Sequence, residues 1–220
     1  FATQQTHELD LSIIKLVGHN PGQGPGYGWP PNARPWINPS PNAASINMAR
    51  IFPGTVLLEG TTLSEGRGTT TPLEVIGAPG LPINNMLTDL ASRAPLWLGS
   101  AYLRECFFTP TFHKHVHQVC AGLQIHTDYP AYDHNEFKPY RLIAGLLKSL
   151  RHIEPAFDIW RFHPYEYEHS RKPIDVINGG PGLRTWVDDP NQGFDVFDAQ
   201  LSKAENRWKE ERQPFLLYPL

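Results

Sequence analysis

The chain of 220 residues has a formal net charge of -3, and its 40% apolar and 11% aromatic residues are typical of a folded globular protein. The negative charge and the lack of a dense Lys/Arg block argue against a nucleic-acid-binding surface. No stretch approaches the ~18 apolar residues that a membrane-spanning helix needs, so we expect no membrane span.

The 22 prolines and 18 glycines predict short elements separated by long loops. The first apolar runs, residues 11–17 and 52–58, have the length and composition of strands. Between them, residues 18–42 contain too many Gly and Pro for a helix or a central strand. Because this long loop carries Tyr27, Trp29 and Trp36, we expect it to pack over another part of the molecule.

Two elements are predicted in the middle of the chain. A short helix is expected to begin at Asn84 or Asn85, either of which is a plausible N-cap, and to end near Arg93. Residues 120–128 predict a strand, because apolar and polar residues alternate there. One face, expected to lie against the core, carries Leu123, Ile125 and Thr127. The other face is polar and carries Gln124, His126 and Asp128.

The C-terminal part contains the clearest helical patterns. Residues 139–153 place their apolar side chains along one stripe, and residues 194–213 repeat the pattern up to a proline. The apolar ending 215–218 is expected to dock as a strand or plug. Strands and helices in irregular order indicate an α+β fold, with a mixed sheet, packed helices and long Gly/Pro-rich loops.

The segment 59–80 is the strongest candidate for a functional loop. Gly66 and Gly68 flank Arg67, so the backbone could approach a ligand closely, and the hydroxyls of residues 61–71 supply neutral donors and acceptors. Such a loop suits a polyhydroxylated or anionic ligand. The segment lacks the Gly-Lys-Ser/Thr ending of a Walker loop and the third glycine of a dinucleotide-binding fingerprint. We therefore expect no cofactor. The alternative is a structural turn in which Arg67 pairs with a nearby carboxylate: Glu59, Glu65 or Glu74.

Three histidines at alternate positions, His113, His115 and His117, would share one face of a strand. Such a face could bind zinc, which would make the protein a zinc hydrolase. No carboxylate or thiolate lies at the standard ligand spacing, and Cys120 breaks the even period. We therefore favour a solvated strand face and expect no metal. Two cysteines, Cys106 and Cys120, are too few to define a disulfide framework, so the sequence does not indicate whether the protein occupies an oxidising or a reducing compartment.

A second polar cluster is the outer face of the predicted strand 120–128. There Asp128 could orient His126 for proton transfer or for contact with a substrate, although a hydrogen-bonded sheet edge explains the pattern equally well. No Gly-x-Ser-x-Gly elbow is present, which disfavours a serine hydrolase. A glycosidase pair could be drawn from several carboxylates, but only their separation in space decides that chemistry. These are Glu59, Glu65, Glu74 and Asp128.

Several runs of the sequence together resemble one bacterial family. They are Pro39 to Asn42, Phe52 to Thr61, Ser64 to Thr70, Ile76 to Pro79, Phe108 to Phe112, Cys120 to His126 and Arg212 to Tyr218. Over roughly residues 10–218 the chain is similar to the NamZ-type exo-β-N-acetylmuramidases, long described as a family of unknown function.

The resemblance implies a glycoside hydrolase of cell wall degradation and muropeptide recycling, which releases N-acetylmuramic acid from the non-reducing ends of peptidoglycan fragments. The family has an N-terminal Rossmann-like lobe and a C-terminal lobe, and residues 1–220 resemble the C-terminal lobe as a single domain. The missing lobe, in cis or in trans, is the expected partner, and its absence explains why the chain begins with Phe1. The family's proposed catalytic glutamate lies in that lobe, so Glu59 is a candidate without an inherited role. Peptidoglycan as substrate implies a periplasmic or secreted protein.

Residues and resemblance combine in one hypothesis for the site. Arg67 binds the lactyl carboxylate of muramic acid bidentately, where that carboxylate is free. Glu59 contacts a sugar hydroxyl or fixes Arg67. The remaining substrate-binding residues are Ser64 and Thr69, close to Arg67, and His126 and Asp128, which line the same interlobe cleft. The alternative is a non-catalytic domain that binds cell-wall sugars or orders a partner domain.

Overall fold

A computed structural model describes residues 10–21 and 33–218. It divides into two compact units, Trp36–Phe197 and a smaller unit of Phe1–Pro35 with Asp198–Leu220. That the whole chain forms one lobe of a two-lobed protein stays a prediction. Tyr27 and Trp29, which we expected to pack over another part of the molecule, lie outside the described residues.

The larger unit contains a three-stranded sheet in the order β1-β3-β2. Its strands are β1 (Val75–Ala78), β2 (Tyr102–Phe108) and β3 (Cys120–His126). Only residues 109–119 join β2 to β3, too short a connection for the helical crossover that parallel strands need. The predicted α+β class is confirmed, whereas the sheet, predicted as mixed, is antiparallel in both of its described pairs.

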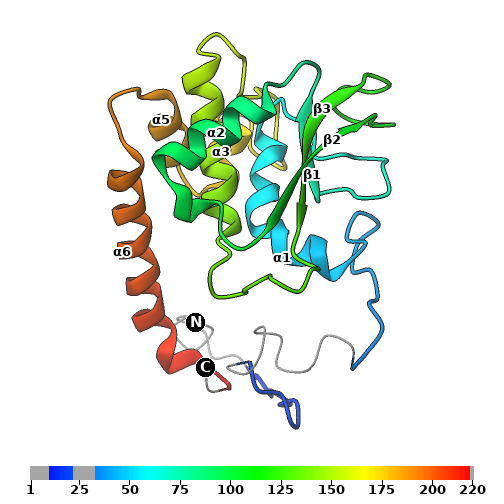
Figure 1. The fold of residues 1–220 in the computed structure, drawn as a ribbon. Coiled ribbons are helices and arrows are strands. Elements are labelled where there is room, and N and C mark those ends of the chain that lie inside the picture. Colours follow the sequence, from blue (N-terminus) through cyan, green and yellow to red (C-terminus); the bar gives the residue numbers. More distant parts are fainter. Residues whose placement is uncertain (1–9, 22–32, 219–220) are drawn as a thin grey trace. The chain divides into compact units, whose positions relative to one another are not determined.

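Helices α1 (Ile46–Thr55), α2 (Ile83–Arg93) and α3 (Pro139–Ile153) lie on one side of the sheet, as Figure 1 shows. The predicted helix 139–153 is confirmed as α3, but residues 141–150 are all buried rather than one stripe of them. A helix buried on all sides is typical of the centre of a domain. Around it the chain forms shorter elements, namely η2 (Val56–Gly60), η3 (Pro95–Trp97), α4 (Pro173–Ile177) and α5 (Gly182–Asp188).

The predicted strand 52–58 is wrong, because these residues end α1 and continue into the 3-10 helix η2. The start of α1 has a clear signal in Ser45, whose side-chain oxygen accepts a hydrogen bond from the Met48 N–H at 2.9 Å. Pro53 and Gly54 are both unfavourable residues inside a helix. Packing overrides that preference: a Cβ at Gly54 would lie 2.1 Å from the Pro139 carbonyl oxygen, so α1 and α3 meet backbone to backbone.

Other predicted elements of the larger unit are confirmed. Helix α2 ends at Arg93 as expected, but it begins at Ile83 after Pro82 rather than at an asparagine cap. In β3 the alternation is also confirmed. The strand ends at His126, two residues before the predicted end. The side chains predicted to face the core, Leu123, Ile125 and Thr127, are at most 1% exposed, whereas Gln124 and His126 are half-buried and Asp128 is exposed.

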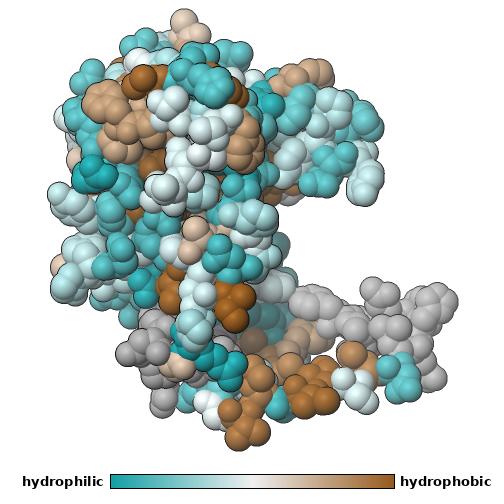
Figure 2. Space-filling view, turned by 90° about the vertical axis from the view of Figure 1, so that its right-hand side faces the viewer, coloured by the Kyte–Doolittle hydropathy of each residue, from teal (hydrophilic) through white to brown (hydrophobic). Residues whose placement is uncertain are grey.

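The smaller unit differs more from expectation. The predicted strand 11–17 is wrong, since this segment has no ladder partner in the described chain, and its apolar side chains are exposed, Ile14 by 95%. Hydrophobic residues, coloured brown, are visible at the surface in the lower part of Figure 2. The Leu16 N–H donates to the Tyr218 hydroxyl at 2.7 Å, so the apolar ending docks through a side chain rather than as a strand.

The C-terminal helix is confirmed as α6 (Phe194–Arg212), followed by η4 (Gln213–Phe215). Its last turn is followed by Pro214, which ends the regular helix as expected. Among the helices of the described residues, none combines the length and apolar character needed to cross a membrane.

The close approach of α1 to α3 gives a test of the fold. We expect Gly54→Ala to lower the free energy of unfolding by about 1–3 kcal/mol, because the new methyl group overlaps the Pro139 carbonyl. Gly180→Ala is the matched control, since a Cβ there meets nothing within 4 Å, and it should change the free energy by less than about 0.5 kcal/mol. Urea unfolding measures both, and equal effects would contradict the assigned packing.

Candidate functional site

A cavity of about 380 Å³ in the larger unit brings Glu59 and Arg67 together. Trp36 and Phe52, which are 37% and 40% exposed, also line it. The Trp36 ring is held in place because its Nε1–H donates to the Ala43 carbonyl at 2.9 Å. A mostly apolar cavity with a few fixed polar groups is the common form of a small-molecule site.

Arg67 is carried by a tight turn between two left-handed glycines. Gly66 and Gly68 have φ angles of +72° and +77°, which residues with a Cβ rarely adopt. A Cβ on Gly68 would also lie 1.8 Å from the hydroxyl of Thr111, whose backbone N–H donates to the Arg67 carbonyl at 3.2 Å. Gly68 thus lets the turn pack against the loop between β2 and β3, and a Cβ on Gly66 would lie 2.3 Å from the Val75 side chain of β1. That these glycines let a ligand approach stays a prediction.

Two carboxylates hold the guanidinium of Arg67. Its Nη2 lies 2.8 Å from Glu59 Oε1 and its Nε lies 3.0 Å from Glu65 Oε1. Of the three partners considered for a structural ion pair, Glu74 is not one, since it accepts hydrogen bonds from Ser45 and Asn47. The Nη1 group of Arg67 has no hydrogen-bond partner among the described residues. The guanidinium is therefore fixed on one edge and available on another.

Glu65 is fully buried and is shared by a second cation. Its Oε2 lies 2.6 Å from the ammonium of Lys114, which is itself only 8% exposed. Burial raises the pKa of Glu65, but the charge of Lys114 and the hydrogen bonds from Lys114 and Arg67 outweigh it, so the pKa lies below its usual range. Both the contacts and the lowered pKa indicate an ionised Glu65, with Arg67 on one carboxylate oxygen and Lys114 on the other.

Glu59 is held through both of its oxygens. Oε1 pairs with Arg67, and Oε2 accepts a hydrogen bond from the Tyr165 hydroxyl at 2.9 Å. Burial, followed by the hydrogen bond to Glu59 and its charge, raises the pKa of Tyr165 to about 12. The backbone beside Glu59 is fixed as well, because a Cβ on Gly60 would lie 2.6 Å from the backbone of Ile174 in α4.

The other predicted site residues lie outside the wall of this cavity. The buried Ser64 hydroxyl accepts a hydrogen bond from the Gly66 N–H at 3.1 Å, and the Thr69 hydroxyl donates to the Gly66 carbonyl at 2.7 Å. Both therefore stabilise the turn that carries Arg67. His126 Nδ1 and Asp128 Oδ1 are 3.5 Å apart, longer than a good hydrogen bond. Their contact with a substrate stays a prediction.

The predicted strand face of three histidines is wrong. His113, His115 and His117 have left-handed φ angles of 76°, 53° and 61° in the loop between β2 and β3, so they do not share a face. His113 lies against Glu65, and a ring nitrogen of His115 bonds to the Thr62 carbonyl at 2.8 Å. In the described ranges no cluster of three or more His, Cys, Asp or Glu residues is arranged to hold a metal ion.

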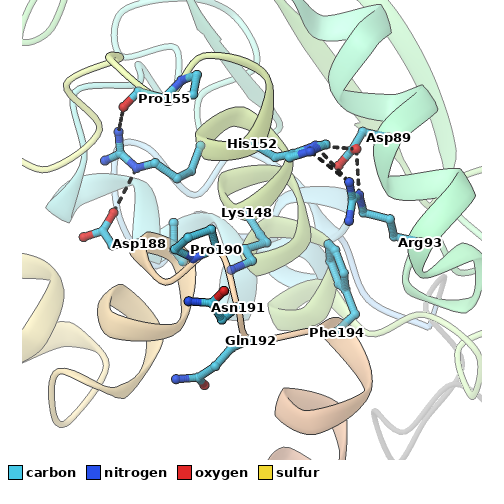
Figure 3. A pocket seen from close by; sticks show the side chains of 13 residues that line it. Asp89, Arg93, Lys148, His152, Pro155, Asp188, Pro190, Asn191, Gln192 and Phe194 are labelled. Carbon is cyan, nitrogen blue, oxygen red and sulfur yellow. Dashed lines mark hydrogen bonds and ion pairs between the residues drawn. The ribbon is translucent and has the colours of Figure 1, made fainter.

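A second cavity, of about 480 Å³, lies where the C-terminal ends of α2 and α3 approach the residues after α5. Figure 3 shows Arg93 and His152 pointing toward Asp89, and their contacts with it are both 2.8 Å long. Lys148 donates to the carbonyls of Trp186 and Asp189 at 2.7 and 2.6 Å. Cations are stabilised at helix C-termini, and those in the last turns of α2 and α3 already pair with carboxylates: Arg93 and His152 with Asp89, and Arg151 with Asp188. This cavity is explained by the fold, so the smaller one is the better candidate site.

Sequence reasoning missed Lys114 and Tyr165. Tyr165 lies 106 residues from Glu59, and Lys114 lies 56 residues from Leu58, whose carbonyl accepts its hydrogen bond. No local pattern connects residues at such distances. Lys114 lies between His113 and His115, and the alternating pattern indicated only the histidines as candidates. Cys106 and Cys120 are both free thiols.

Comparisons with known proteins identify relatives of this chain. The family model described as exo-β-N-acetylmuramidase NamZ, C-terminal, matches residues 50–218. The peptidoglycan β-N-acetylmuramidase NamZ of Bacillus subtilis (strain 168) is 29% identical over 185 residues, which cover 84% of this chain and 41% of that protein. The chain therefore spans less than half the length of this relative.

Two solved structures share the fold. Both are DUF1343 family proteins from Bacteroides fragilis NCTC 9343. One superimposes with a TM-score of 0.64 at 18% identity and covers 84% of this chain and 45% of that one. The other has a TM-score of 0.56 at 23% identity, with 83% and 44% covered.

The buried Glu65 gives a pH-dependent test of the site. Because the folded-state pKa of Glu65 is depressed, its stabilisation is complete above the unfolded value of about 4.5 and is lost as the pH falls through the folded value. We expect Glu65→Gln to lower the free energy of unfolding by about 3 kcal/mol at pH 7, with a smaller difference from the native protein below pH 4. Unfolding in urea from pH 3 to pH 7 measures this. Glu210→Gln on the exposed face of α6 is the control, and a pH-independent effect of Glu65→Gln would contradict the ionised pair.

Proposed function

The chain belongs to the exo-β-N-acetylmuramidase NamZ family, whose C-terminal part its residues 50–218 match, and from that membership we propose that it is the substrate-reading lobe of a peptidoglycan-processing glycoside hydrolase. The named relative is a peptidoglycan β-N-acetylmuramidase. The proposed reaction is release of N-acetylmuramic acid from non-reducing ends. Because the chain spans 41% of that relative, the other part of the site is proposed to come from an N-terminal lobe, in cis or in trans.

One observation supports this proposal most directly: Arg67 lines the cavity with its guanidinium already fixed. Its Nε and Nη2 are held by Glu65 and Glu59, which leaves Nη1 and the second Nη2 proton as a parallel pair of donors. Such a pair matches the two oxygens of a carboxylate. Muramic acid carries a lactyl group with a carboxylate that N-acetylglucosamine lacks, so Arg67 would distinguish the two sugars.

The remaining lining fits the body of a sugar. The rings of Trp36 and Phe52 border the same cavity and are partly exposed, and aromatic faces pack against the apolar C–H faces of a sugar ring. In this proposal Ser64 and Thr69 act through the turn that they stabilise. His126 and Asp128 remain proposed contacts with more distant parts of the substrate.

Glu59 acts in this proposal as an anchor for Arg67. Both of its oxygens are engaged, one by Arg67 and one by Tyr165, so a role as proton donor to a leaving group would require it to give up a fixed partner. The catalytic acid is therefore proposed to come from the partner lobe. A peptidoglycan substrate also leads us to propose a periplasmic or secreted location.

The carboxylate assignment predicts a selective loss of binding. In the two-lobed protein Arg67→Ala should weaken the affinity for N-acetylmuramic acid by about 10- to 100-fold, the range for a hydrogen bond to a charged group, and leave weak binding of N-acetylglucosamine unchanged. Isothermal titration calorimetry measures both affinities. Arg207→Ala on α6 is the control, because that side chain is 75% exposed. Unchanged muramic acid binding by Arg67→Ala would refute the assignment.

The split site predicts that neither half works alone. A 4-nitrophenyl β-N-acetylmuramide should be hydrolysed when both lobes are present and not by either lobe separately. Release of nitrophenol, followed by absorbance, reports this. Turnover by the N-terminal lobe alone, with sugar binding by this chain, would instead support a non-catalytic cell-wall-binding or scaffolding domain.

A further inference from the structure

The loop between β2 and β3 has an unusual backbone around Lys114. The residues on both sides of it, His113 and His115, are left-handed, and such residues persist only where the surrounding structure holds them. The loop is anchored on the turn that carries Arg67, through the hydrogen bond from the Thr111 N–H to the Arg67 carbonyl. The side chain of Lys114 is buried, although the residues around it in the sequence are mostly exposed.

The Lys114 ammonium uses all three of its donors inside the protein. It donates to the carbonyls of Leu58 at 2.7 Å and of Thr61 at 3.2 Å, and its third contact is Glu65 Oε2 at 2.6 Å. The two carbonyls belong to the segment that carries Glu59. One cation thus ties the backbone around Glu59 to the carboxylate that holds Nε of Arg67.

This arrangement determines how strongly Arg67 is drawn into the protein. Glu65 is fully buried, so its negative charge needs a counter-charge, and Lys114, which does not line the cavity, supplies one. Without Lys114, Arg67 would be the principal cation facing Glu65. It would be drawn toward Glu65 and away from Glu59, and its free donors would leave the cavity.

On the basis of the proposed function, we propose that Lys114 is a positioning residue for the recognition of a carboxylate-bearing sugar. By neutralising Glu65 and fixing the segment of Glu59, it keeps the Nη1 edge of Arg67 aimed at the ligand. It does not touch the ligand itself, since it does not line the cavity.

The test compares two ligands that differ only in the carboxylate. The affinities of the two-lobed protein for N-acetylmuramic acid and for its lactyl carboxamide are measured by calorimetry, and their ratio reports recognition of the charge. We expect Lys114→Met to lower this ratio by roughly tenfold and to have little further effect when Arg67 is already alanine, as expected for coupled residues. Lys203→Met, an exposed lysine of α6, is the matched control and should leave the ratio unchanged.

A spectroscopic signal separates positioning from general stability. The Nε–H resonance of Arg67, identified as the one that Arg67→Lys removes, should shift in Lys114→Met because its partner Glu65 has lost the second cation. If Lys114→Met does not fold, Lys114→Gln, whose amide can still donate to the backbone carbonyls but carries no charge, should lower the ratio in the same way.

The outcomes distinguish the two proposals. If Arg67→Ala leaves the ratio unchanged, the proposed function is wrong. If Arg67→Ala abolishes the preference for the carboxylate but Lys114→Met keeps the ratio and the Nε–H resonance of the native protein, the positioning role is wrong. Equal weakening of both ligands by Lys114→Met, additive with Arg67→Ala, would also overturn it.

Discussion

The candidate site depends on one buried ion pair, between the ammonium of Lys114 and the carboxylate of Glu65. Burying two charges is unfavourable unless every donor and acceptor around them is used. Here the remaining donors of Lys114 reach two backbone carbonyls, and the second oxygen of Glu65 receives Arg67. The burial of the pair is tolerated because both charged groups have further partners besides each other. In turn it fixes the 3-10 helix of Glu59, the glycine-flanked turn of Arg67 and the loop between β2 and β3.

The two cavities described above, of about 480 and 380 Å³, differ in how their cations are paired. In the larger one the cations lie at helix C-termini, and their donors reach carboxylates or backbone carbonyls of the same wall. In the smaller one Arg67 is held by two carboxylates along one edge only. In the proposed site a ligand would therefore meet a guanidinium that is already oriented, and little side-chain entropy would be lost on binding.

Long periodic segments were predictable from the sequence, and long-range contacts were not. Helices α3 and α6 follow from apolar spacing over many residues, whereas the helix of residues 46–55 is hidden by Pro53 and Gly54 and forms because that glycine packs on α3. The segment of Glu59 and Arg67 was found because glycines, hydroxyls and charges cluster there. Its partners Lys114 and Tyr165 come from distant loops, so only the folded chain reveals them.

The bond between Tyr165 and Glu59 has a consequence for the order in which the protein acquires its site. The two residues lie 106 positions apart, and Lys114 falls between them in the chain. Because ribosomes synthesise proteins from the N-terminus, Glu59 and Arg67 emerge first, Lys114 follows, and Tyr165 comes last. The nascent chain therefore carries an incomplete cluster of charges until Tyr165 has been made, and the candidate site is completed by its most C-terminal member.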